Sequence, residues 1–217
     1  SQVLDQLRPP AHAPEFSRVF AARTCMMAGV GLTGVFLWYL VRFWVYGKAV
    51  VLTSAPLTIP AGFLIAGMAV ATLIGAALAS WAAGPISERI EEKNIPVARV
   101  VAGACLLYAA GLALAWGLGV WSTGTARENG MLLFALISGF AFGVYDSLGL
   151  ELVMDSLPDP RRAGHDLGIY ALANSAIIGA LLVNAFEHSF GYYLLFPSAI
   201  VMVLLAGIVT LTTKSAE

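Results

Sequence analysis

Long apolar runs recur along this chain, and they constrain its fold more than any other feature. Six runs of about 20 residues are separated by polar segments that contain proline, glycine or charge. A bilayer hydrocarbon core about 30 Å thick needs roughly 20 apolar residues of helix to cross it. The runs lack the alternation of membrane barrel strands, and lipid leaves no backbone group unpaired. We therefore expect an all-α membrane protein built as a bundle of six transmembrane helices.

The expected spans are defined by the polar segments between them. They cover residues 19–46, 59–83, 100–121, 131–154, 167–186 and 192–211. Residues 1–18 then form an N-terminal tail or linker, residues 19–213 the transmembrane domain, and residues 214–217 a C-terminal tail.

The composition excludes several other classes of protein. Charged residues make up 12% of the chain and apolar residues 59%, with a net charge of −1. Soluble chains carry about 25% charged residues, so a water-soluble globule and a disordered chain are both excluded. The absence of a basic surplus also argues against a nucleic-acid partner. Membrane lipid is the expected surrounding of this chain.

The distribution of positive charge predicts the orientation. Lys and Arg are concentrated in the tails and alternate loops on one side of the membrane: Arg8, Arg18, Arg23, Arg89, Lys93, Arg99, Arg161, Arg162 and Lys214. The other side has Arg42, Lys48 and Arg127. Because cytoplasmic loops carry the excess of Lys and Arg, both termini are predicted to be cytoplasmic.

The fourth span contains an acid that should be expensive to place in lipid. Gly139, Gly143 and Asp146 recur at i, i+4 and i+7 and share one helix face. Small residues at this spacing let another helix approach closely, so Asp146 should face protein. An intramembrane carboxylate is a functional candidate, here for cation coupling or gating. The alternative is a structural acid paired with a neighbouring helix. Glu151 and Asp155 are further candidates near the cytoplasmic end, where solvation or pairing with arginine is an equally simple role.

Three other side chains are candidates for a substrate pathway. Tyr170 and Asn174 follow Asp166 at helical spacing and form a polar stripe in the fifth span. Asn174 could bind substrate or could instead bond to a neighbouring helix. Arg42 lies near the outer end of the first span, where its long stem would also allow it to reach the interface. No nucleophile motif or metal-ligand spacing is present in the sequence, so we expect no enzyme, no metal and no cofactor.

The loop after the second span resembles a sequence motif of the major facilitator superfamily. Gly84 and Arg89 match its Gly-x-x-x-Asp-Arg-x-Gly-Arg-Arg/Lys pattern, Glu88 replaces the acid, and Lys93 stands for the trailing base. In the family this loop latches neighbouring helices on the cytoplasmic side. Glu91 and Glu92 depart from the pattern and would weaken such a latch. The alternative is a solvated loop retained for topology.

Two further segments strengthen the resemblance. They are the entry Pro14–Arg18 and the run Asp155–Pro160, followed by Ala163, Gly164 and Gly168. The stretch from Val153 to Ala173 resembles bacterial glycoside–pentoside–hexuronide and sucrose-type cation symporters. The resemblance implies the C-terminal six-helix half of a transporter in the bacterial plasma (inner) membrane, multi-pass, and working by alternating access with a second six-helix half.

Two functions follow from these expectations. In the first, the chain is half of a cation-coupled secondary transporter of a sugar or similar small solute, completed by an N-terminal half or another copy. In the second, it is a non-transporting scaffold or accessory subunit of a larger membrane complex. Small-residue faces such as Gly139 and Gly143 suit subunit packing as well as gating.

Overall fold

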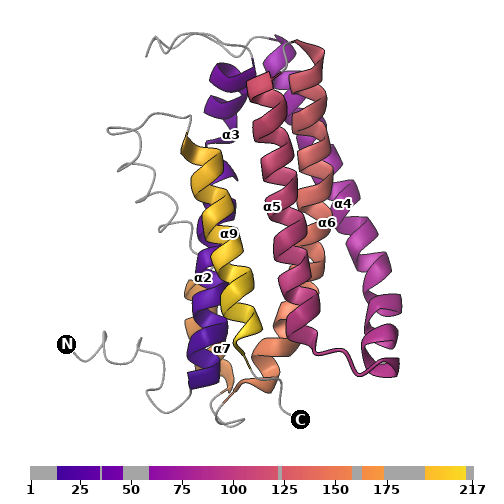
Figure 1. The fold of residues 1–217 in the computed structure, drawn as a ribbon, viewed down its shortest axis with the longest axis vertical. Helices are drawn as coiled ribbons and strands as arrows, with labels where there is room; N and C mark the ends of the chain where they lie inside the picture. The colour runs from indigo at the N-terminus through magenta and orange to yellow at the C-terminus, as the bar shows by residue number, and fades with distance from the viewer. Residues whose placement is uncertain are drawn as a thin grey trace, which may run out of the picture.

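The structure is a computed structural model that describes residues 14–34, 36–45, 59–121, 124–157, 163–173 and 194–213. The regular structure in these ranges is helical, and Figure 1 shows it as a bundle of long helices. The long helices are α2 (Pro14–Gly34), α4 (Ile59–Glu92), α5 (Val97–Trp121), α6 (Thr125–Asp155) and α9 (Leu195–Leu211). The short ones are α3 (Leu37–Tyr39), the π-helix η1 (Leu40–Val45) and α7 (Ala163–Leu172).

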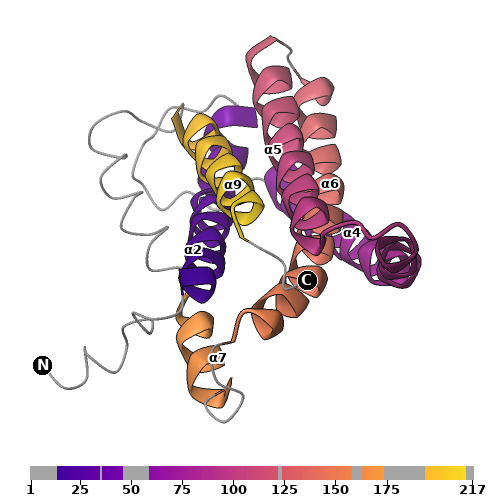
Figure 2. The same ribbon diagram turned by 60° about the horizontal axis from the view of Figure 1, so that its bottom comes forward.

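The long helices pack in a sequence of neighbours that differs from their order in the chain. α4 packs on α6, α6 on α5, α5 on α9, and α9 on α2. Figure 2 shows the α2–α9 pair on one side of α5 and α4 on the far side of α6. α2 and α6 make only slight contact with each other. The first turn of α2 and the last turn of α9 lie at the same end of the bundle (Figure 1).

Two apolar clusters hold these helices together. The larger one runs through the bundle and includes Met26 and Leu32 from α2, Leu112 from α5, and Phe196 and Val203 from α9. The smaller one lies where α7 meets the start of α2 and the end of α6; its buried members are Phe16, Val19, Ala98, Leu152, Val153, Ile169 and Tyr170. α7 is thereby fixed at the end of the bundle at which α2 begins.

Contacts between α2 and α9 join the first and last helices of the described ranges. Pro14 begins α2, a position where its missing N–H costs nothing, and Glu15 follows in the first turn. Arg18 lies 2.8 Å from Glu15 and also donates a hydrogen bond to the Thr212 carbonyl, at 3.1 Å. Thr212 caps the C-terminal end of α9, where carbonyls lack helical partners and a cation is favourable.

Three helices in the described ranges are long and apolar enough to cross a membrane: Ala61–Glu92, Val97–Trp121 and Thr125–Asp155. The outward face of α4 is apolar, with Phe63, Leu73 and Trp81 exposed by 74%, 70% and 79%. Such a face would be unfavourable in water and suits lipid. The expectation of a helical membrane protein is therefore confirmed.

The end of α4 differs from the sequence-based expectation. A loop was expected from Gly84, but the helix continues to Glu92 despite the proline inside it at position 85. Ile86 and Ile90 lie one turn apart in this extension and belong to the larger apolar cluster, which explains why the helix persists.

The helix then ends in a Schellman motif. Asn94 has a φ of 48° and donates its N–H to the Glu91 carbonyl, and Ile95 donates to the Ile90 carbonyl. Pro96 follows directly, and a proline just beyond a C-cap prevents the helix from resuming.

The other expected spans correspond to helices over part or all of their length. The first is α2, which ends at Gly34, followed by α3 and η1. The third, fourth and sixth are α5, α6 and α9. The fifth begins as α7, and its remainder from residue 174 lies outside the described residues.

Candidate functional site

An ion pair joins α2 to α6, with its arginine buried and its carboxylate half-exposed. Nη2 of Arg23 lies 2.7 Å from Oδ1 of Asp146, a distance typical of a charge-assisted hydrogen bond. The two partners differ in their surroundings, because the Arg23 side chain is 6% exposed and the Asp146 side chain 55% exposed. The pair spans the gap between two helices that otherwise make only slight contact.

Three aromatic rings surround the Arg23 guanidinium. Its Cζ lies 5.7 Å from the centroid of Phe142, 5.5 Å from that of Tyr145 and 5.6 Å from that of Tyr170. Phe142 and Tyr145 are themselves stacked, with centroids 6.4 Å apart. Cation–π contacts contribute roughly 0.5–2 kcal/mol each, depending on desolvation. Arg23 is thus stabilised by rings from α6 and α7 as well as by the carboxylate.

Asp146 lies at the wall of a cavity of about 370 Å³ between α2, α4, α5 and α6. The cavity is lined by Val30, Thr72, Ala76, Ser80, Tyr108, Ser138, Gly139, Phe142, Gly143, Asp146 and Ser147. Most of this lining is apolar or weakly polar, and Asp146 is its charged member. The Asp146 carboxylate therefore contacts the buried arginine and also lines the cavity.

The serine and threonine hydroxyl groups of the cavity wall are hydrogen-bonded within their own helices. Each donates to a backbone carbonyl three or four residues earlier: Thr72 to Met68, Ser80 to Ala76, Ser138 to Ala135 and Ser147 to Gly143, at 2.9–3.1 Å. Because these protons are engaged, the hydroxyl oxygens present lone pairs. Together with the Asp146 carboxylate they make a wall of hydrogen-bond acceptors, which suits a cation or a donor.

The cavity wall depends on the close approach of α4 to α6. A Cβ built on Gly139 would collide with the Thr72 carbonyl, and one built on Gly143 would lie 2.6 Å from the Ala79 Cβ. Gly75 on α4 is equally crowded by the backbone of α6. The small-residue face predicted around Gly139 thus receives a neighbouring helix, as expected.

Asp146 is paired with a base on a neighbouring helix, as the structural interpretation expected, and it also lines the cavity. Glu151 and Asp155 are exposed on the last turns of α6 and are not among the residues that line the cavity.

The three substrate-pathway candidates lie in different parts of the chain, and only Tyr170 has a described side chain. Tyr170 is buried and packs over Arg23, so it contacts the pair and does not line the cavity. Asp166, one turn earlier, is buried and lies 3.2 Å from the ring nitrogen Nδ1 of His165. Arg42 lies in η1, but its side chain is outside the described part of the structure, and so is Asn174.

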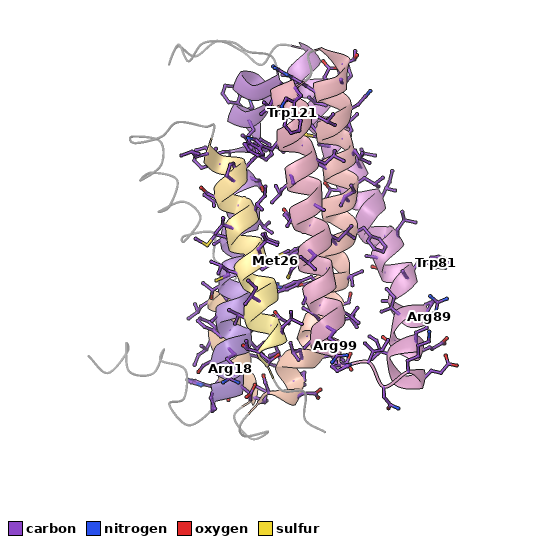
Figure 3. All side chains as sticks on the ribbon, in the orientation of Figure 1. Arg18, Met26, Trp81, Arg89, Arg99 and Trp121 are labelled. Atoms are coloured by element: carbon purple, nitrogen blue, oxygen red, sulfur yellow. The ribbon has the colours of Figure 1, made fainter. Side chains whose placement is uncertain are left out.

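The latch candidates lie apart from the ion pair. Gly84, Glu88 and Arg89 are exposed on the extension of α4, and Lys93 is in the turn that follows. Figure 3 shows Arg89, Arg99 and Arg18 towards one end of the bundle and Trp121 at the other. Three of these four residues therefore lie in the last part of a helix, where a loop was expected.

Arg23 is not where the charge distribution predicted it. The residue was expected among the charges that set the topology at the first entry, but its side chain is buried in the bundle against Asp146. A usable signal existed, because Arg23 interrupts an apolar run, and ionisable groups within membrane helices usually pair with one another. Phe142 and Tyr145 were also missed, although both lie between the two residues Gly139 and Asp146 that define the predicted face.

Comparisons with models of protein families, with curated proteins and with solved structures find no match to this chain.

Proposed function

We propose that this chain is one six-helix half of a cation-coupled secondary transporter, working by alternating access with a second half. The solute is a sugar or a similar small molecule, as the resemblance to the major facilitator superfamily implies. Both termini are cytoplasmic in this proposal, and the membrane is a bacterial plasma membrane. Asp146 is the coupling or gating carboxylate, and Glu88 with Arg89 belong to the cytoplasmic latch.

The observation that carries this proposal is the Arg23–Asp146 pair at the wall of the cavity. Ionisable groups inside a membrane bundle are expensive and mark ion or substrate paths. The Asp146 carboxylate is half-exposed and lines the cavity, so an ion or solute in the cavity can reach it.

The arrangement of helices favours a second half. α2 and α6 make slight contact with each other, and the cavity lies between them and α4. A path between two bundles needs an open face of this kind, because transporter sites lie at the interface of repeated halves.

Uptake by proteoliposomes tests the proposal. The chain, together with its second half, should drive sugar accumulation under an imposed sodium or proton gradient. Asp146→Asn should abolish accumulation against a gradient while allowing exchange or leak. Glu128→Gln, an acid in the first turn of the same helix, is the matched control and should transport normally. Unchanged accumulation by Asp146→Asn would remove the coupling role.

The scaffold function remains the second candidate, because the exposed apolar face of α4 can pack against another subunit as well as against lipid. Purification with stoichiometric large partners, together with absence of solute uptake, would favour the scaffold over the transporter.

A further inference from the structure

The cavity beside Asp146 is elongated along α6 and carries its charge at one end. Its wall on α6 extends from Ser138 to Ser147, about 13 Å of helix at 1.5 Å per residue. Asp146, the charged residue among the described wall residues, lies in the last turn of this stretch. A volume of about 370 Å³ is at the lower end of the range of small-molecule sites, so the cavity suits a small solute.

α4 contributes a hydroxyl group to the same end of the cavity. Gly143 of α6 lies against Ala79, because a Cβ built on it would be 2.6 Å from the Ala79 Cβ. Ser80 follows Ala79 and therefore lies beside the turn of α6 that holds Asp146 and Ser147. The hydroxyl protons of both serines are bonded to carbonyls of their own helices, which leaves their oxygens as acceptors. This end of the cavity therefore suits a solute that donates hydrogen bonds.

The rest of the wall offers little to a polar solute. Val30, Ala76 and the rings of Tyr108 and Phe142 make up much of it, and its other serine and threonine hydroxyl groups bond within their own helices. The described wall contains no amide and no basic side chain, so acceptor groups of a solute find few donors. A free hexose has hydroxyl groups on every side, and several of them would lose their hydrogen bonds to water without replacement.

The charge balance of the site excludes ions. Arg23 compensates the charge of Asp146 at 2.7 Å, but it is 6% exposed and is not a wall residue, so it cannot reach a solute. Separating the pair would leave a buried guanidinium without a counter-charge, so the pair persists when a solute enters. A charged solute would therefore bring a third, uncompensated charge into a largely apolar cavity. An anion is excluded most strongly, because the carboxylate stands between it and the arginine.

We propose that the cavity binds an uncharged amphiphile, whose hydroxyl groups donate to Asp146, Ser80 and Ser147 while its apolar part packs against Phe142. The inference rests on the proposed transport of a small solute and names the class of that solute. Oδ1 of Asp146 accepts from Arg23, and a carboxylate has about four lone-pair sites, so the solute binds beside the ion pair without displacing it. A sugar fits this description when one of its ends carries an apolar group.

Four probes test the class on the unmodified full-length chain in lipid nanodiscs. The first, 1-phenylethane-1,2-diol, is uncharged and has two hydroxyl groups at one end. The others are its cationic relative 2-amino-1-phenylethanol, its anionic relative mandelate, and glucose. Equilibrium dialysis, corrected with empty nanodiscs, measures each affinity. The diol should bind with a dissociation constant in the millimolar range, as expected for so small a molecule, and about tenfold more tightly than each other probe.

Two serine variants test the orientation of the solute. Ser80→Ala and Ser147→Ala each remove one acceptor from the polar end, and each should weaken binding of the diol about two- to tenfold. Ser156→Ala is the matched control, because this serine also bonds to a carbonyl of α6 but does not line the cavity. It should leave the affinity unchanged. Unchanged affinity in both Ser80→Ala and Ser147→Ala would overturn the placement of the hydroxyl groups at this end.

The results distinguish this inference from the proposed function. Binding of glucose or of either charged probe as tightly as the diol overturns the uncharged amphiphile, and so does absence of diol binding at about 10 mM. Coupled uptake that depends on Asp146 would still support the transporter in either case. Preferential binding of the diol, without uptake of any solute in the presence of the second half, supports the uncharged amphiphile and overturns the transporter.

Discussion

A single arginine connects three helices of this bundle through one carboxylate and three rings. Arg23 comes from α2, Asp146, Phe142 and Tyr145 from α6, and Tyr170 from α7. The acid could be predicted, because glycines at i and i+4 before it define a protein-facing stripe. Its partner could not be predicted from charge counting, since a base near the start of a span looks the same whether it marks the interface or pairs inside the bundle.

Tyr170 offers a direct test of the aromatic surround. Tyr170→Leu keeps apolar volume but removes the ring, and we expect it to lower the free energy of unfolding by about 1–2 kcal/mol. Tyr170→Phe keeps the ring and should retain most of the stability. Denaturant titration in detergent measures both.

The difference between these variants should shrink in an Arg23→Gln background, because the cation is then absent. Equal stability of Tyr170→Leu and Tyr170→Phe in the unmodified background would show that the ring does not hold the arginine.

At the scale of elements, the sequence located the helices better than their ends. The length of the apolar runs predicted α5, α6 and α9 closely. The extension of α4 was expected to be a loop, because the stretch from Gly84 is polar and resembles a loop motif. Proline removes one hydrogen bond from a helix, and two isoleucines packed in the apolar cluster are enough to carry the helix past it. The true stop is Asn94, whose side chain tolerates the left-handed backbone.

α4 and α6 approach each other so closely at Gly139 that a larger side chain there should destabilise the protein. We expect Gly139→Leu to lower the free energy of unfolding by about 1–3 kcal/mol, because a side chain there would meet the α4 backbone. Gly103→Leu is the matched control on α5, where an added Cβ meets no atom within 4 Å. Unfolding in sodium dodecyl sulphate, followed by circular dichroism, measures both variants. Equal losses would indicate a general effect of leucine and not this crossing.

For the whole molecule, the sequence predicted a helical membrane protein but not which helices would be neighbours. In a membrane helix the apolar residues cover most of the circumference, so periodicity identifies no unique contact face. The neighbour order α4, α6, α5, α9, α2 depends instead on where glycine and alanine permit close approach. Gly29 against Val203 is one such point, between α2 and α9.

The orientation of the bundle can be tested by labelling in intact bacterial cells. Lys93→Cys precedes α5 and Thr125→Cys follows it, so the two lie at opposite ends of this helix. In a background that lacks Cys25 and Cys105, an impermeant maleimide should label Thr125→Cys in intact cells and Lys93→Cys only after lysis. The reverse pattern would invert the proposed orientation, and identical labelling of both would contradict a membrane crossing by α5.

The pairing of the first and last helices has a consequence for biosynthesis. Arg18 and Thr212 are bonded across 194 positions of sequence. At about 5–20 residues per second, a ribosome needs roughly 10–40 seconds to make the intervening chain. During that interval α2 has been synthesised but α9, its main neighbour, has not. Arg23 likewise has no ion-pair partner until Asp146 has been synthesised. We therefore expect α2, the first helix of the described ranges, to be among the last to reach its final packing. Until then its unpaired faces should remain in contact with the insertion machinery.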